Sequence, residues 1–220
     1  MSVLKAIVRL LLVATLAALT PLHAAETNTL ARIGAQLEQH AVIRAEFTQR
    51  KQMAAMKRPL LTSGRLVLSR QHGVLWQIEQ PLRISYVLGE ERIVEIGADG
   101  ARRERGVRDV PGLAQVSRVF RAMLGADSAA LREQFDAAAH GDPAQWEIIL
   151  TPRNAQLAQF LTRLQLSGGR FVSDISIVEA GGDTTQINFH HTQGSNALSD
   201  TELQLFGVDQ TPSAKPAGTR

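Results

Sequence analysis

Short runs in which apolar and polar residues alternate are the feature that most constrains how this 220-residue chain can fold. Successive side chains of a strand point to opposite faces, so each run predicts a strand with one apolar face. Turn sequences such as Gly89-Glu90, Ala98-Asp99-Gly100 and Gly168-Gly169 separate neighbouring runs, which predicts an antiparallel meander. The expected strands lie at residues 47–51, 65–70, 74–79, 84–88, 92–96, 146–150, 161–166, 171–179, 184–192 and 202–207.

Other parts of the chain have helical spacing. Leu30, Ile33 and Leu37 predict an amphipathic helix over residues 29–47. A second helical segment is expected at 110–124, between the two groups of strands, and shorter helical turns are expected at 129–135 and 155–160. This order predicts one α+β domain in which the sheet curls into an incomplete antiparallel β-barrel and the helices fill its concave side.

Residues 1–25 have the pattern of a secretory signal peptide. Lys5 and Arg9 are followed by an apolar run over residues 10–19 and by the small residues Ala24 and Ala25. We therefore expect a signal peptide at 1–25, a single domain at 26–209 and a disordered tail at 210–220. The expected location is the periplasm, with the protein soluble.

The composition excludes several classes of function. The chain has no cysteine, which excludes disulfides, thiolate metal sites, cysteine nucleophiles and acylation as a lipoprotein. The net charge is +3, and without Lys5 and Arg9 it falls to +1. This near-neutral balance, together with one tyrosine and two tryptophans, argues against a nucleic-acid partner.

Chemical motifs are scarce. No phosphate-binding loop, dinucleotide fingerprint or Gly-x-Ser-x-Gly sequence is present. His190 and His191 are neighbours on an expected strand, so their rings point apart and cannot share a metal ion. Asp174 and Glu179 are expected on opposite faces, and Asp183 lies in a turn. We therefore predict no catalytic residue, metal or cofactor; a lipid-modifying hydrolase that uses these carboxylates or His191 stays open as an alternative.

Arg102, Arg103 and Arg105 belong to the densest cluster of charge in the chain. Such a cluster is either a solvated loop or a docking site for an acidic partner or an anionic membrane surface. A non-catalytic module that senses lipids or docks to an envelope complex is therefore a second interpretation of the chain.

An ordered set of motifs extends over most of the chain after the expected signal peptide. It comprises Phe47-Thr48-Gln49, Ser63-Gly64-Arg65-Leu66, Arg70, Trp76, Gln80-Pro81, the segment from Trp146 to Pro152, the segment from Phe171 to Glu179, and Thr184-Thr185-Gln186-Ile187. This ordered set resembles the LolA family of periplasmic carriers of outer-membrane lipoproteins.

The resemblance implies an unclosed antiparallel barrel with a helical lid over a hydrophobic cavity for acyl chains, and no enzymatic activity. It implies acylated lipoprotein or other lipid as cargo, an inner-membrane donor complex, an outer-membrane acceptor and a monomeric carrier. It also implies that Arg70 points inward and hydrogen-bonds the lid in the closed state. Two features depart from the family: Gln71 replaces the usual proline, and the C-terminal strand is reduced. Members similar to this family also accompany aryl-polyene and related lipid pathways, and such a branch is an open alternative for this chain.

We expect the cavity to be lined from the sheet and from the lid. The expected sheet residues are Leu66, Leu68, Trp76, Ile78 and Val87, and the expected lid residues are Leu113, Val116, Phe120 and Met123. Ordinary core packing is the alternative for each of them.

Overall fold

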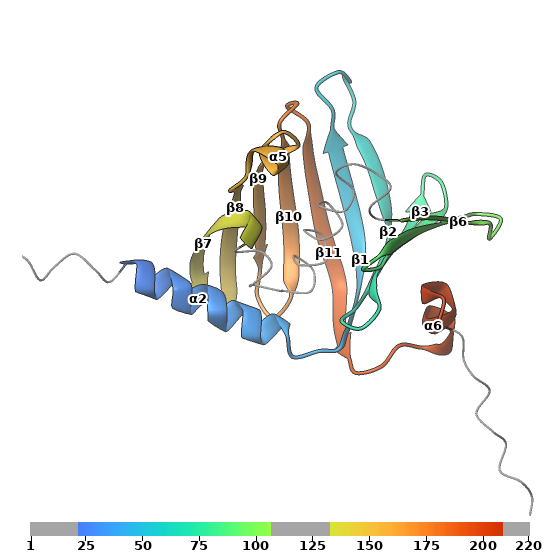
Figure 1. Cartoon of the computed structure of the whole chain (residues 1–220), viewed down its shortest axis with the longest axis horizontal. Coiled ribbons are helices and arrows are strands. Elements are labelled where there is room, and N and C mark those ends of the chain that lie inside the picture. The colour runs from blue at the N-terminus through green and yellow to red at the C-terminus, as the bar shows by residue number, and fades with distance from the viewer. Residues whose placement is uncertain (1–21, 107–132, 209–220) are drawn as a thin grey trace, which may run out of the picture.

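Eleven antiparallel strands form one open sheet in the computed structural model, which describes residues 22–106 and 133–208 (Figure 1). The strand order is β6-β5-β4-β3-β2-β1-β11-β10-β9-β8-β7, so β6 and β7 are the two edges and do not pair with each other. This confirms the expected open antiparallel sheet. The strands are β1 (Val42–Gln52), β2 (Leu60–Ser69), β3 (Gly73–Gln80), β4 (Ile84–Leu88), β5 (Arg92–Gly97), β6 (Arg102–Gly106), β7 (Phe135–Asp142), β8 (Gln145–Pro152), β9 (Leu161–Gly168), β10 (Val172–Glu179) and β11 (Thr184–Ser195).

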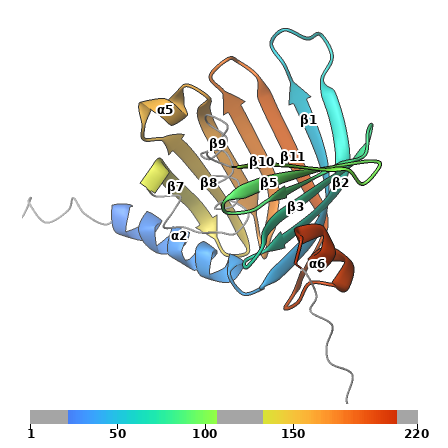
Figure 2. The same ribbon diagram turned by 45° about the vertical axis from the view of Figure 1, so that its right-hand side comes forward.

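The sheet is strongly curved, and we call its concave side the inner face (Figure 2). Strand β1 lies at its centre and pairs with β2 on one side and with β11 on the other. The first and last strands of the chain are therefore neighbours in the sheet. Inward-facing residues from nearly every strand form one buried apolar cluster. It includes Phe47, Leu66, Trp76, Leu150, Leu164 and Ile175.

A second, smaller apolar cluster lies on the outer face. Val67, Leu75 and Val94 belong to it, and Phe206 of helix α6 (Asp200–Phe206) covers it. Residues Leu66 to Ser69 and Val74 to Trp76 are consequently buried without interruption, although they alternate between the two faces. The sheet is therefore covered on both sides in this region.

Helix α2 runs from Leu22 to Leu37, so the expected helix at 29–47 was wrong at both ends. Val42 and Ile43 are β-branched and join β1 instead, where they pair with β2 and β11. The apolar side of α2 packs on the inner cluster through Leu30, Ile33 and Leu37.

One end of the sheet is bonded to α2. The Gln36 amide donates from Nε2 to the carbonyl oxygens of Pro143 at 2.7 Å and Gly169 at 2.6 Å. These two residues lie in the turns after β7 and β9, and α2 runs beside that end of the sheet in both views (Figures 1 and 2).

Three further segments differ from the sequence expectation. Residues 202–207, expected as a strand, belong to α6, which begins at a capping box between Ser199 and Glu202 and ends at Gly207 with φ of 76°. Phe135, expected at the end of a helical turn, begins β7. Arg102 to Gly106 form β6 rather than a loop. The short helix α5 (Ala155–Ala158) was expected.

The remaining expectations fall outside the described residues. These are most of the signal peptide, the helical segment at 110–124 and the tail at 210–220. Within the described ranges, none of the helices has the length and hydropathy needed to cross a bilayer.

Candidate functional site

Four of the expected sheet residues share the inner face. Leu66, Leu68 and Trp76 are buried in the inner cluster, and Ile78 packs against it. The Trp76 indole stacks on Phe47 with ring centroids 3.9 Å apart and meets Phe189 edge-on at 6.3 Å. An aromatic group at the centre of the sheet therefore joins β1, β3 and β11 into one apolar surface.

Val87 lies on the other face, so its place among the inner residues was wrong. It pairs with Leu75, whereas Trp76 pairs with Tyr86. Val87 is buried in the outer cluster with Phe206. Partners directly across a strand pair share a face, so Tyr86 is the residue that β4 contributes beside Trp76.

Tyr86 and Leu88 are the inner-face residues of β4 that the sequence analysis missed. Both pack against the inner cluster but stay only partly buried. Burial raises the pKa of the Tyr86 hydroxyl, and the neighbouring Glu95 carboxylate adds to this rise. The alternation of Ile84, Tyr86 and Leu88 in the sequence places these three residues on one face of β4.

Burial along the inner face is uneven. Leu150, Leu164 and Ile175 on β8 to β10 are almost completely buried. Ile78 and Tyr86 on β3 and β4 are only half-buried. The β3–β4 part of the inner face is therefore apolar surface that a ligand can reach, and Ile177 on β10 is also only half-buried. The expected lid residues Leu113, Val116, Phe120 and Met123 lie outside the described residues.

Arg70 is exposed and follows the last residue of β2. Its Nε donates to the carbonyl oxygen of His40 at 2.9 Å, and its Nη2 donates to that of Leu37 at 2.8 Å. Leu37 is the last residue of α2, whose carbonyl end attracts a positive charge. The side chain therefore ties the end of α2 to the β2–β3 turn.

The arginines of β6 do not form one patch. Arg103 pairs with Glu95 across the strands and lies 3.6 Å from its carboxylate, on the inner side. Arg105 is two positions along and shares that side. Arg102 points to the outer side, where its Nη2 donates to the Leu205 carbonyl of α6 at 3.0 Å. A strand in place of the expected loop thus divides the predicted docking cluster between two faces.

The carboxylates considered for hydrolysis take part in structural hydrogen bonds and ion pairs. Asp174 accepts hydrogen bonds from Asn188 and Ser173. Glu179 and Asp183 instead form ion pairs with Lys51, at 2.7 Å and 3.7 Å. In the described ranges no three His, Asp or Glu side chains are arranged to hold a metal ion.

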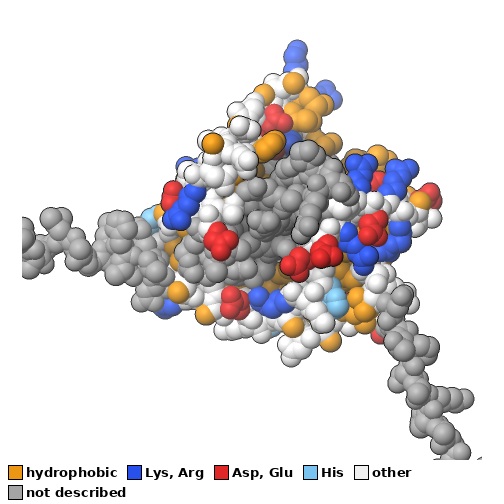
Figure 3. Space-filling view, viewed as in Figure 1, with side chains coloured by type: hydrophobic (Ala, Val, Ile, Leu, Met, Phe, Trp, Pro, Cys, Tyr) orange, Lys and Arg blue, Asp and Glu red, His pale blue; other side chains and the backbone are white. Residues whose placement is uncertain are grey.

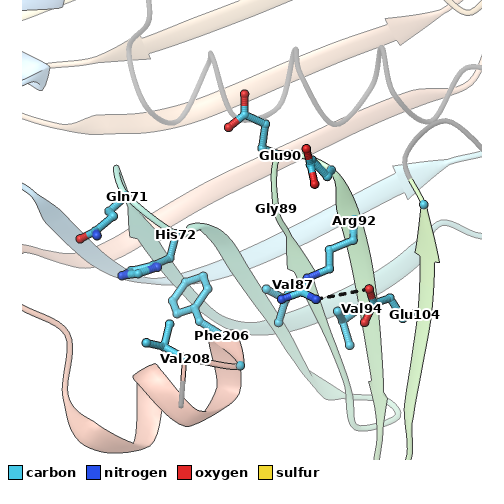
Figure 4. Close-up of a pocket in the computed structure, with 13 residues that line it drawn as sticks. Gln71, His72, Val87, Gly89, Glu90, Arg92, Val94, Glu104, Phe206 and Val208 are labelled. Carbon is cyan, nitrogen blue, oxygen red and sulfur yellow. Dashed lines mark hydrogen bonds and ion pairs between the residues drawn. The ribbon is translucent and has the colours of Figure 1, made fainter. Parts of the chain in front are cut away.

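A pocket of about 660 Å³ opens on the outer face between α6 and the β4–β5 turn (Figure 4). Val87, Val94 and Phe206 form its apolar part, and the ion pair between Arg92 and Glu104 lies at its edge. Charged groups around the opening disfavour an acyl chain, so the inner face is the better candidate for apolar cargo.

The family model described as "Outer membrane lipoprotein carrier protein LolA-like" matches residues 23–187. This range includes nearly all of α2, strands β1 to β10 and the first four residues of β11. The chain belongs to this LolA-like family. The resemblance stated from the sequence motifs is thereby confirmed. None of the curated proteins matches the sequence.

Several solved structures are similar to this LolA-like chain. A LolA superfamily protein from Nitrosomonas europaea has 7% identity and a TM-score of 0.45, with 80% of this chain and 96% of that chain covered. The MucA/MucB complex of Pseudomonas aeruginosa has 13% identity and a TM-score of 0.46, with 82% and 60% covered. The Mycobacterium tuberculosis lipoprotein LppX has 8% identity and a TM-score of 0.44, with 79% and 98% covered.

Proposed function

We propose that this LolA-like protein is a periplasmic carrier without enzymatic activity. It binds the acyl chains of lipoproteins or other lipids on its inner face and moves them from an inner-membrane donor towards an outer-membrane acceptor. The observation that carries the proposal is the continuous apolar inner face, whose β3–β4 part, with Ile78 and Tyr86, is only half-buried. Membership of a lipoprotein-carrier family supports it.

The energetics of acyl chains favour incomplete burial. Each methylene removed from water contributes about 0.8 kcal/mol, so one sixteen-carbon chain contributes roughly 12 kcal/mol. Three fully buried chains would exceed the practical limit of about 20 kcal/mol for non-covalent binding, and release would stall. A partly open face, as on β3 and β4, binds such chains while leaving release attainable.

The first test is mass spectrometry of organic extracts from the protein, purified from the periplasm without detergent. We expect acylated cargo in near-stoichiometric amount. A reproducibly empty protein that also takes up no fluorescent acyl probe would contradict the carrier function and favour the envelope-docking module.

A matched pair of variants on β3 locates the binding face. Ile78→Glu places a carboxylate on the inner face, whereas Gln77→Glu places one at the adjacent, also half-buried position on the outer face. A charge beside an acyl chain must be desolvated, so we expect Ile78→Glu to raise the Kd for an acyl probe at least tenfold. Gln77→Glu should leave the Kd unchanged. Equal Kd values for the two variants would exclude the inner face as the binding site.

A further inference from the structure

The hairpin between β1 and β2 projects beyond the rest of the sheet, at the top of Figure 1. Leu60 and Leu61 pair with Lys51 and Arg50 of β1, but the pairing of β2 with β3 begins only at Ser63. The first residues of β2 and the loop at 53–59 therefore extend past the end of β3.

Apolar side chains are exposed on both faces of this hairpin. Leu60 is 44% exposed and Leu61 is 61% exposed, and as successive strand residues they point to opposite faces. Met56 in the loop is 50% exposed. Of the other large exposed apolar side chains of the described ranges, Leu82 follows the end of β3 and Phe160 precedes β9, so each is separate in sequence from the hairpin. Single exposed apolar residues are ordinary, whereas a cluster marks an interaction site.

The tip of the hairpin is also basic. Lys57 and Arg58 are exposed, and neither takes part in the ion pairs found among the described residues. Lys51, which lies on β1 behind the tip, instead forms ion pairs with Glu179 and Asp183. Figure 3 shows Lys and Arg side chains at the uppermost tip with apolar side chains directly beneath them.

We propose that this hairpin docks the protein on an anionic phospholipid surface. Met56, Leu60 and Leu61 enter the boundary of the acyl region, and Lys57 and Arg58 bind lipid phosphates. A protein groove would cover one face of the hairpin, whereas a lipid boundary surrounds both faces, which fits the two-sided exposure. The hairpin lies at the opposite end of β1 from the turn that follows α2. The proposal goes beyond cargo binding, because it concerns the surface on which the carrier rests.

Flotation with lipid vesicles tests the proposal. We expect the full chain to bind vesicles that contain phosphatidylglycerol, to bind neutral phosphatidylcholine vesicles much more weakly, and to lose binding as salt is raised. Residues 1–25, the expected signal peptide, are the same in the parent protein and in every variant. Any vesicle binding through them therefore cancels when a variant is compared with the parent.

Two variants with matched controls assign the binding to the hairpin. Replacing Lys57 and Arg58 by Gln should weaken binding about fivefold for each cation removed. The same change at Arg103 and Arg105, which are also exposed, should have little effect. Leu60→Gln with Leu61→Gln should weaken binding about tenfold or more, whereas Leu82→Gln should not. Exposed positions tolerate such changes, so the unfolding temperatures should match that of the parent.

Equal loss of binding in the hairpin and control variants would overturn the proposal, as would binding that is indifferent to lipid charge. A parent protein that does not bind vesicles would also overturn the proposal. This holds as well where the hairpin variants lose binding to a protein partner instead. The hairpin variants should keep the parent's Kd for an acyl probe, and Ile78→Glu should keep vesicle binding. Failure of membrane docking is thereby distinguished from failure of the carrier function.

Discussion

At the scale of single residues, Arg44 joins the last helix to the centre of the sheet. Its Nε and Nη2 donate to the two carboxylate oxygens of Glu202, both at 2.6 Å, and its Nη1 donates to Ser195 at 2.7 Å. Glu202 also accepts a hydrogen bond from the backbone of Ser199, which completes the capping box of α6. One carboxylate therefore both caps the helix and bonds it to β1.

This bond predicts a dependence of stability on pH. The hydrogen bond from Arg44 lowers the pKa of Glu202 in the folded protein, although burial opposes the shift. A lowered folded pKa means that the contribution to stability is present above the unfolded pKa, about 4.3, and is lost as the pH falls through the folded pKa. We expect the free energy of unfolding to decrease as the pH falls below about 4.3, and part of this decrease to be absent in Glu202→Gln.

Chemical denaturation at several pH values measures this effect. Because the pair is partly exposed, we expect it to contribute only about 1 kcal/mol at neutral pH. A double-mutant cycle with Arg44→Met isolates the coupling. As a control, Glu79→Gln breaks a more exposed ion pair with Arg65 and should change the stability by less than about 0.5 kcal/mol. An acid dependence in Glu202→Gln identical to that of the parent would contradict the assignment.

Arg70 leads to a second prediction at this scale. Arg70→Leu removes one hydrogen bond to the last carbonyl of α2 and one to the His40 carbonyl just beyond the helix, so we expect the free energy of unfolding to fall by about 1 kcal/mol. The family resemblance implies that Arg70 gates the cavity, which remains a proposal. On that proposal, Arg70→Leu should also release a bound acyl probe more slowly than the parent protein. Denaturation and stopped-flow release measure the two effects separately. Arg65→Leu, at an exposed position on β2, is the control, and equal release rates in Arg70→Leu and the parent would argue against the gate.

At the scale of elements, alternation predicted most strands, but helix and strand boundaries depended on other interactions. Ala137 and its alanine neighbours favour a helix intrinsically, yet they form β7 because they pair with β8. The charges of β6 resemble a loop but suit an edge strand, where charged side chains are common. Leu203 and Leu205 alternate like strand residues, although Ser199, Glu202 and Gly207 already formed a recognisable pair of helix caps.

The same limits apply to the candidate site. Leu66, Leu68, Trp76 and Ile78 could be assigned to one face because β2 and β3 alternate regularly. Val87 was assigned to the wrong face. An apolar outer cluster lies under α6, so both faces of β4 carry apolar residues and alternation alone could not show which face is the inner one. The hydrogen bonds of Arg70 could not be predicted, because they depend on where α2 ends in space.

At the scale of the whole molecule, the sheet has two apolar faces with different coverings. The outer cluster is covered by Phe206 of α6, whereas Ile78 and Tyr86 on the inner face stay half-buried. A helix as short as α6 depends on packing for its stability, so its removal should uncover the outer cluster. The two faces should therefore respond separately to mutation, the outer one in stability and the inner one in ligand binding.

Phe206→Ala tests this separation. Truncating a buried phenylalanine typically costs about 3 kcal/mol, so we expect a fall of that order in the free energy of unfolding and increased binding of a hydrophobic dye. The Kd for an acyl probe should stay that of the parent, because Phe206 and the inner residues Trp76 and Ile78 lie on opposite sides of the sheet. Gln204→Ala, at an exposed position of α6, should change neither quantity. A parallel loss of probe affinity in Phe206→Ala would mean that the outer cluster holds the inner face in its binding shape, and the two faces would then act as one unit.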